Sequence, residues 1–179
     1  MFNFFKKKKE EPEYNPLDLK VTDLRKGFIF EYDLRQWEVQ EEYTYDWGDN
    51  YYTFEYKVSD GTETRYLSIE EDDEIELIWM EKVRLSAFDE DIEKEILNNK
   101  RPPRQIIFNG IIYYREEESP GYYKGAKQDW TELISWTYYD ETEKKALSIE
   151  QWGDRSFEAS YGDILELFEI SNIIPGSSE

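Results

Sequence analysis

From Leu17 onward, apolar and polar residues alternate along most of the chain. A period of two is typical of β-strands, because successive side chains of a strand point to opposite faces of the sheet. Asp60-Gly61 separates two such runs and predicts a hairpin turn, and Ser119-Pro120-Gly121 predicts another turn. The chain is therefore predicted to be mainly β. The alternating runs contain Phe28, Phe30 and Tyr32; Trp37 and Val39; Tyr52, Phe54, Tyr56 and Val58; residues 65–70; Ile75, Leu77 and Trp79; Ile106 and Phe108; and residues 130–139.

One segment has a helical period instead. Phe88, Ile92 and Ile96 are four residues apart, which places them on one face of a helix. Acidic residues occupy its first turn, and Asp89 is the predicted N-cap. The Asn and Pro residues over 98–103 end it. We therefore predict one short amphipathic helix in this segment.

The chain resembles itself when it is shifted by 80 residues. Leu67-Ser68-Ile69-Glu70 then aligns with Leu147-Ser148-Ile149-Glu150, within a matching apolar pattern. Such an internal repeat predicts a duplicated antiparallel meander: two copies of about four strands, forming a sandwich or a barrel-like sheet and joined by the short helix. The predicted divisions are an N-terminal tail over 1–16, a first β repeat over 17–87, the helix and Pro-Pro linker over 88–105, and a second β repeat over 106–175.

Composition narrows the available chemistry. The 179 residues include 42 acids and 22 bases, giving a net charge of −20, and they include no His and no Cys. These absences exclude an imidazole base, a thiolate nucleophile, a Ser-His-Asp triad, a Cys or His metal site and a disulfide framework. The mean hydropathy of −0.89 is low for a globular protein. However, 6 Trp, 15 Tyr and 10 Phe supply large side chains for a core, so we expect a folded chain.

The N-terminal tip differs from the acidic remainder, because it combines aromatic and basic residues. Its apolar stretch is too short for a signal peptide or a membrane span, so we expect a cytoplasmic protein. Two interpretations remain for the tip: a disordered tail, or a weak tether to the inner face of the membrane. The candidate membrane-surface residues are Phe2, Phe4, Phe5, Lys6, Lys7, Lys8 and Lys9.

A set of short motifs is spread over both halves of the chain. They are Gly27-Phe28, Tyr32 and Trp37; Asp60-Gly61; the segment Tyr66 to Glu70; Asn109-Gly110-Ile111-Ile112-Tyr113; the segment Leu147 to Glu150; Trp152-Gly153; and Phe157-Glu158. Over residues 17–170 the chain thereby resembles a bacterial family of unknown function, DUF4178. The resemblance implies no particular activity, and it implies a setting in a bacterial stress-type system at the membrane.

The repeated polar residues are candidates for a binding site. If Leu67 and Ile69 face a core, Ser68 and Glu70 face the other way, and the same holds in the second copy. Packing does not require the Ser and Glu to recur. One interpretation is structural, with each Glu accepting hydrogen bonds from the backbone of the turn that follows it. The other is a pair of polar sites for a partner protein or a small cationic ligand, and its candidate residues are Ser68, Glu70, Ser148, Glu150, Trp37 and Trp152.

The charge balance favours a protein partner with a basic surface and disfavours direct nucleic-acid binding. The acidic segment 70–74 lacks the spacing of a calcium loop, and we expect no metal and no cofactor. We therefore expect a non-enzymatic binding or scaffold protein. One alternative is an acidic mimic of DNA that inhibits a DNA-binding protein. A weaker alternative is a carbohydrate-active enzyme that uses Glu70 and Glu150. The repeat counts against it, because two repeated positions imply similar surroundings, whereas a glycosidase needs two carboxyls with different pKa values.

Overall fold

The computed structural model describes residues 14–15 and 17–176. The described residues form eleven strands, one α-helix and three short 3₁₀ helices. The strands are β1 (Ile29–Tyr32), β2 (Arg35–Asp46), β3 (Tyr52–Ser59), β4 (Thr64–Glu71), β5 (Ile75–Val83), β6 (Gln105–Phe108), β7 (Ile111–Gly125), β8 (Thr131–Asp140), β9 (Lys145–Trp152), β10 (Ser156–Leu165) and β11 (Ser171–Ile174). The helices are η1 (Val21–Asp23), η2 (Leu85–Ala87), α1 (Ile92–Asn99) and η3 (Leu167–Glu169).

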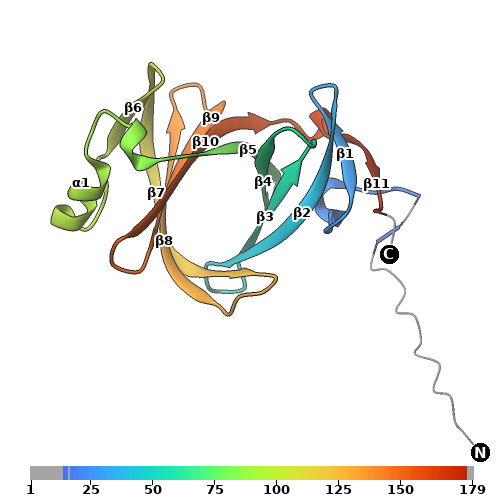
Figure 1. Cartoon of the computed structure of the whole chain (residues 1–179), viewed down its shortest axis with the longest axis horizontal. Helices are drawn as coiled ribbons and strands as arrows, with labels where there is room; N and C mark the ends of the chain where they lie inside the picture. The colour runs from blue at the N-terminus through green and yellow to red at the C-terminus, as the bar shows by residue number, and fades with distance from the viewer. Residues whose placement is uncertain (1–13, 16, 177–179) are drawn as a thin grey trace, which may run out of the picture.

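All eleven strands belong to one sheet, in the order β11-β1-β2-β3-β4-β5-β10-β9-β8-β7-β6. An additional antiparallel pairing joins β2 to β7. Eight strands, β2 to β5 and β7 to β10, therefore close into a ring, and β1, β11 and β6 extend the sheet outside it (Figure 1). The predicted mainly β fold with one α-helix is confirmed within the described residues.

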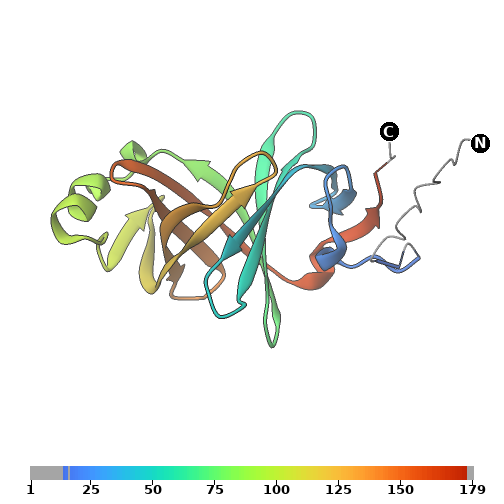
Figure 2. The same ribbon diagram turned by 90° about the horizontal axis from the view of Figure 1, so that it is seen from below.

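Two hydrophobic cores lie on the outer face of this ring. The first packs β1 to β5 against residues of η1 and of the C-terminal segment, and Leu67 and Ile69 are at its centre. The second packs α1 and β6 against β7 to β10, with Leu147 and Ile149 at its centre. Figure 2 shows α1 at one end of the long axis, and β1 and β11 at the other. Because side chains alternate along a strand, the residues between these apolar positions face the interior of the ring.

The strand β7 corrects one sequence prediction. Ser119-Pro120-Gly121 is not a turn but lies inside β7, where Pro120 pairs with Ile134 of β8. The other edge of β7 pairs with β6 before this point and with β2 after it, so among the described strands one edge of β7 is unpaired at Pro120, a position in which a strand tolerates proline. The strand needs a glycine at position 121, where β7 approaches the end of β2, because a Cβ there would lie 2.5 Å from the Trp47 ring.

The helix α1 begins later than the sequence predicts. Its N-cap is Asp91 rather than Asp89, because the Asp91 side chain accepts a hydrogen bond from the backbone N–H of Lys94 at 3.1 Å. Phe88 precedes the helix, and it is buried with Ile92 and Ile96 in the second core as the period of four predicts.

The two halves of the chain follow the same strand order, but the duplication stays a prediction. Each half is a meander of five strands rather than about four, and Leu67 and Leu147 lie on the fourth strand of their respective halves. The register differs, however. Leu67 pairs with Tyr56, whereas Leu147 pairs with Tyr138, two residues beyond the Trp136 that the shift of 80 aligns with Tyr56.

Candidate functional site

Four of the six predicted binding residues line one cavity inside the ring. Ser68 and Glu70 project into it from β4, and Ser148 and Glu150 project into it from β9. The cavity has a volume of about 100 Å³. The alternation of these residues with buried Leu and Ile therefore brings both copies of the Ser and Glu pair to the same polar interior.

A much larger cleft of about 990 Å³ lies beside this cavity. Tyr45 and Glu55 line both spaces and thus form the floor between them. The cleft is lined by Tyr43, Tyr45, Glu55, Tyr66, Lys82, Val83, Arg84, Leu85, Tyr123, Gln128, Asp129, Thr131, Trp152, Ser156, Phe157, Glu158 and Ala159. A ligand site of this size and mixed character is the default location for binding in a protein of unknown function.

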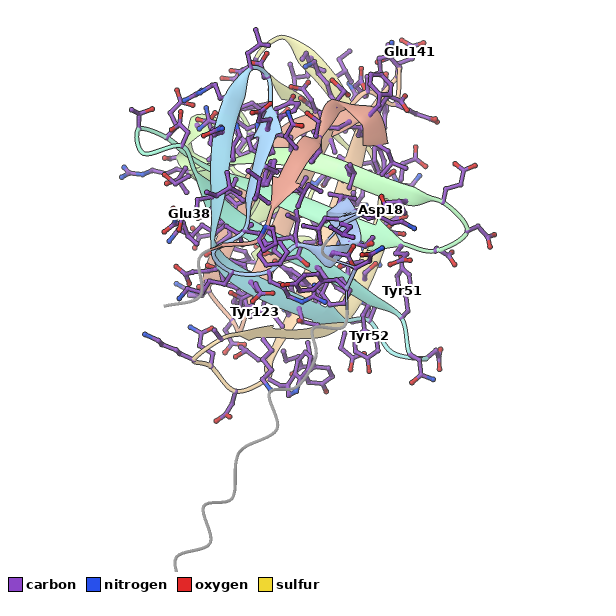
Figure 3. The ribbon with its side chains drawn as sticks, turned by 90° about the vertical axis from the view of Figure 1, so that its right-hand side faces the viewer. Asp18, Glu38, Tyr51, Tyr52, Tyr123 and Glu141 are labelled. Carbon is purple, nitrogen blue, oxygen red and sulfur yellow. The ribbon has the colours of Figure 1, made fainter. Side chains whose placement is uncertain are left out.

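Aromatic rings form one wall of the cleft. Tyr123 lies edge-on to Trp152, with ring centroids 4.7 Å apart, and contacts Tyr45 at 5.3 Å. The β2–β7 pairing positions these rings, because it pairs Tyr45 directly with Tyr123. In Figure 3, Tyr123 lies well apart from Glu141, which belongs to the β8–β9 turn.

An acid–lysine cluster, consisting of Glu55, Lys82, Glu150 and Glu158, lies between the cleft and the interior cavity: Lys82 and Glu158 line the cleft, Glu150 lines the cavity, and Glu55 lines both. The Lys82 Nζ is 3.1 Å from Oε2 of Glu158 and 4.0 Å from Oε1 of Glu55. The same ammonium lies 4.8 Å from the centre of the Tyr66 ring. Glu150 joins the cluster from β9, where it pairs directly with Glu158 of β10. Three carboxyl groups therefore share one lysine.

The pKa values of this cluster depart from their ordinary ranges. Burial raises the pKa of Glu150 from 4.5 to about 7, although Lys82 and the Tyr45 hydroxyl act in the opposite direction. Burial also raises the pKa of Glu55, again against the effect of Lys82. For Lys82 burial alone would lower the pKa, but the charges of Glu55, Glu150 and Glu158 raise it. Lys82 is thus held as a cation, and Glu150 takes up and releases a proton near neutral pH.

Two buried polar atoms at this site have no hydrogen-bond partner among the described residues. They are the Oε2 atom of Glu150 and the indole Nε1 of Trp152. Glu150 is only 9% exposed, so the unpaired oxygen lies in a place where desolvation is costly. One acceptor and one donor, two residues apart on β9, thus remain available to an occupant of the site.

The other end of the ring interior is also acidic. The Tyr51 hydroxyl donates to Glu70, and the Tyr139 hydroxyl donates to Glu76 at 3.3 Å. Burial and the charge of Glu70 raise the pKa of Glu76 and also that of Glu117. Figure 3 shows Tyr51 beside Tyr52, where the chain enters β3.

Trp37 does not join the other predicted residues. It is 2% exposed in the first core, where its ring lies edge-on to Trp79. The capping interpretation also differs from the structure. Among the described residues neither Glu70 nor Glu150 accepts a hydrogen bond from the backbone of the following turn, and Glu70 accepts one from Tyr51 instead. The similar surroundings expected for Glu70 and Glu150 are not found, since Glu150 is buried and Glu70 is half-buried.

Over residues 14–15 and 17–176, acidic side chains form no group of three that could hold a metal ion. Within the same residues, no helix is long and apolar enough to span a membrane. The candidate membrane-surface residues Phe2, Phe4, Phe5, Lys6, Lys7, Lys8 and Lys9 lie outside the described part of the chain.

Comparison with known proteins places the chain in a family. The model of the family described as "Domain of unknown function (DUF4178)" matches residues 25–166. The chain belongs to the DUF4178 family. An uncharacterised protein of Aquifex aeolicus (strain VF5) is 25% identical over 171 residues, which cover 96% of this chain and 94% of that protein. No solved structure matches the chain.

All lining residues of the cleft and of the interior cavity fall within the segment that matches DUF4178. Sequence reasoning missed Glu55, Lys82 and Glu158 among them. Glu55 lies between Phe54 and Tyr56 in an alternating strand, and this position is the available signal, because a charged residue between apolar positions points to the opposite face, which in a closed sheet is the interior. Lys82 gave no comparable signal, since its strand pairs with a strand far away in the sequence.

Proposed function

We propose that this protein is a non-enzymatic binding module, and that its cleft receives a positively charged side chain from a protein partner with a basic surface. The observation that carries the proposal is the excess of carboxyl groups at the cleft, where Glu55 and Glu158 face the single ammonium of Lys82. Buried carboxylates with too few donors are costly, and a cationic group in the cleft would supply a further donor.

Charge supports this occupant. Of the cluster, only Lys82 is basic, so ionisation of Glu55, Glu150 and Glu158 leaves the site with excess negative charge. The whole chain carries a net charge of −20, which would attract a basic partner and orient its approach.

The aromatic wall supports the same occupant. Tyr43, Tyr66, Tyr123 and Trp152 line the cleft, and a cation placed over an aromatic face is stabilised by the ring quadrupole. The cleft already contains such a contact, between the Lys82 ammonium and the Tyr66 ring. The apolar faces would also contact the methylene stem of a long basic side chain.

Isothermal titration calorimetry with N-acetylated tetralysine amide tests the proposal directly. We expect binding at low salt that is absent for the same peptide with acetylated lysines. The Glu55→Gln variant should bind the tetralysine roughly tenfold or more weakly, because it removes a hydrogen bond or ion pair to a charged group.

Glu141→Gln is the matched control. It changes the net charge by the same amount, but Glu141 is exposed and lies away from the cleft. Equal losses in both variants would attribute the binding to general charge and refute the cleft as its location. Binding of the acetylated peptide would refute the cationic occupant.

The membrane-surface role of the N-terminal tip remains a separate part of the proposed function. Its support is the sequence alone, in which three Phe residues precede four lysines. A tether of this kind would bring the binding module close to a membrane without taking part in the cleft.

A further inference from the structure

The cavity inside the ring is acidic and contains no basic side chain. Among the described residues, its lining includes five glutamates and no Lys or Arg: Glu55, Glu70, Glu76, Glu117 and Glu150. Ser68, Ser119, Ser135, Ser148 and Thr137 add hydroxyl oxygens around the same space. The interior therefore presents many acceptors and few cations.

The buried oxygen of Glu150 gives an independent sign of a missing occupant. Glu150 lines this inner cavity rather than the outer cleft, and its Oε2 has no partner in the described part of the chain. The nearby charged and titratable groups do not satisfy this oxygen: Lys82 donates to Glu158, and Glu55 and Glu158 are themselves acids. The Tyr45 hydroxyl lowers the pKa of Glu150, but Oε2 has no partner in the described residues. A donor that enters the cavity would complete this carboxylate.

The distribution of acceptors identifies the chemical class of that donor. The five glutamates come from β3, β4, β5, β7 and β9, on all sides of the ring, and they form no group of three that could hold a metal ion. A guanidinium needs acceptors in one plane, whereas the three N–H bonds of a primary ammonium point in different directions. A volume of about 100 Å³ equals that of about three waters, which suits a small cationic head.

The cleft and the cavity are adjacent, because Tyr45 and Glu55 line both spaces, so a group that moves from the cleft to Glu150 must pass these two side chains. We propose that the ring interior binds the primary ammonium group of a lysine side chain, which enters from the cleft and reaches the carboxylate of Glu150. This inference rests on the proposed function, and it specifies lysine rather than arginine as the group that the partner inserts.

The test compares three probes by calorimetry at pH 8: N-acetylated tetralysine amide, N-acetylated tetra-arginine amide, and n-butylammonium chloride as the free side chain. Tetralysine should bind about tenfold or more tightly than tetra-arginine. Glu150→Gln should bind tetralysine roughly tenfold or more weakly than the unmodified protein does. Its affinity for tetra-arginine should equal that of the Glu141→Gln control. Butylammonium should compete with tetralysine in the unmodified protein and not in Glu150→Gln.

Different outcomes separate this inference from the proposed function. Equal affinity for the two peptides, with Glu150→Gln behaving like the control, would overturn the lysine site but leave a cation-binding cleft. Absence of binding by either peptide would overturn the proposed function. Binding of butylammonium alone would overturn the lysine side chain as the occupant and identify a small free amine instead. Circular dichroism of each variant excludes unfolding as the cause, and Glu55→Gln provides a second substitution at the shared floor.

Discussion

Replacing Glu150 with Gln should make the stability of the protein less dependent on pH. Glu150 is 9% exposed, and burial raises its pKa to about 7 from an ordinary value of 4.5. A carboxyl whose pKa is higher in the folded state contributes stability below its unfolded pKa and loses that contribution as the pH rises through its folded pKa. Between pH 5 and pH 8, this linkage corresponds to a loss of about 2 to 3 kcal/mol for the unmodified protein.

Urea unfolding at pH 5 and pH 8 measures this difference. The unmodified protein should lose about 2 to 3 kcal/mol more unfolding free energy over the interval than Glu150→Gln does. The chain has no histidine, and the other carboxyls with raised pKa values, Glu55, Glu76 and Glu117, are present in both proteins, so the difference between the two pH dependences reports on Glu150. Ser148→Ala, which alters the same cavity without removing a titratable group, should keep the slope of the unmodified protein. Equal slopes for the unmodified protein and Glu150→Gln would refute the assignment of a buried carboxyl that titrates near pH 7.

Three other predictions concern packing and the N-terminal tip. Gly162→Ala should destabilise the protein by about 3 kcal/mol, because a Cβ there would lie 1.8 Å from the Trp79 carbonyl oxygen, and an unchanged melting temperature would contradict the β5–β10 approach. Leu67→Ala and Leu147→Ala should each lower the free energy of unfolding by about 3 kcal/mol. Each variant should still unfold in one transition, because both cores share the ring, and separate transitions by fluorescence and circular dichroism would contradict this coupling. Deleting residues 1–9 should abolish sedimentation with anionic liposomes at low salt, and equal sedimentation of both chains would favour the disordered-tail interpretation.

Local features of the fold could be predicted from the sequence because neighbouring residues determine them. Asp60-Gly61 forms the β3–β4 turn, where Gly61 has a φ of +91° and the Asp60 carboxylate accepts the backbone N–H groups of Thr62 and Glu63. Alternation also separated Leu67 and Ile69 from the polar residues between them. These predictions needed only the period of the strand and the conformational freedom of glycine.

Features that depend on distant strands could not be predicted in this way. The β2–β7 pairing joins segments about 80 residues apart, and it alone turns a meander into a ring with an interior. When this pairing is not known, the sequence does not indicate that Glu55 and Lys82 lie together, and Pro120 predicts a turn. Trp37 was assigned to the site because aromatic residues suit both cores and binding surfaces, and the alternating pattern does not distinguish between these roles.

The position of β11 has a consequence for folding during synthesis. β11 pairs with β1, and Leu165 and Ile170 are buried in the first core together with Phe28 and Phe30. The N-terminal half of the chain therefore leaves the ribosome before the residues that complete its own core exist. Until the last strand is made, the apolar residues near the N-terminus and the free edge of β1 stay open to other chains. Truncation at the C-terminus should accordingly promote aggregation during expression even where every residue of the cleft is retained.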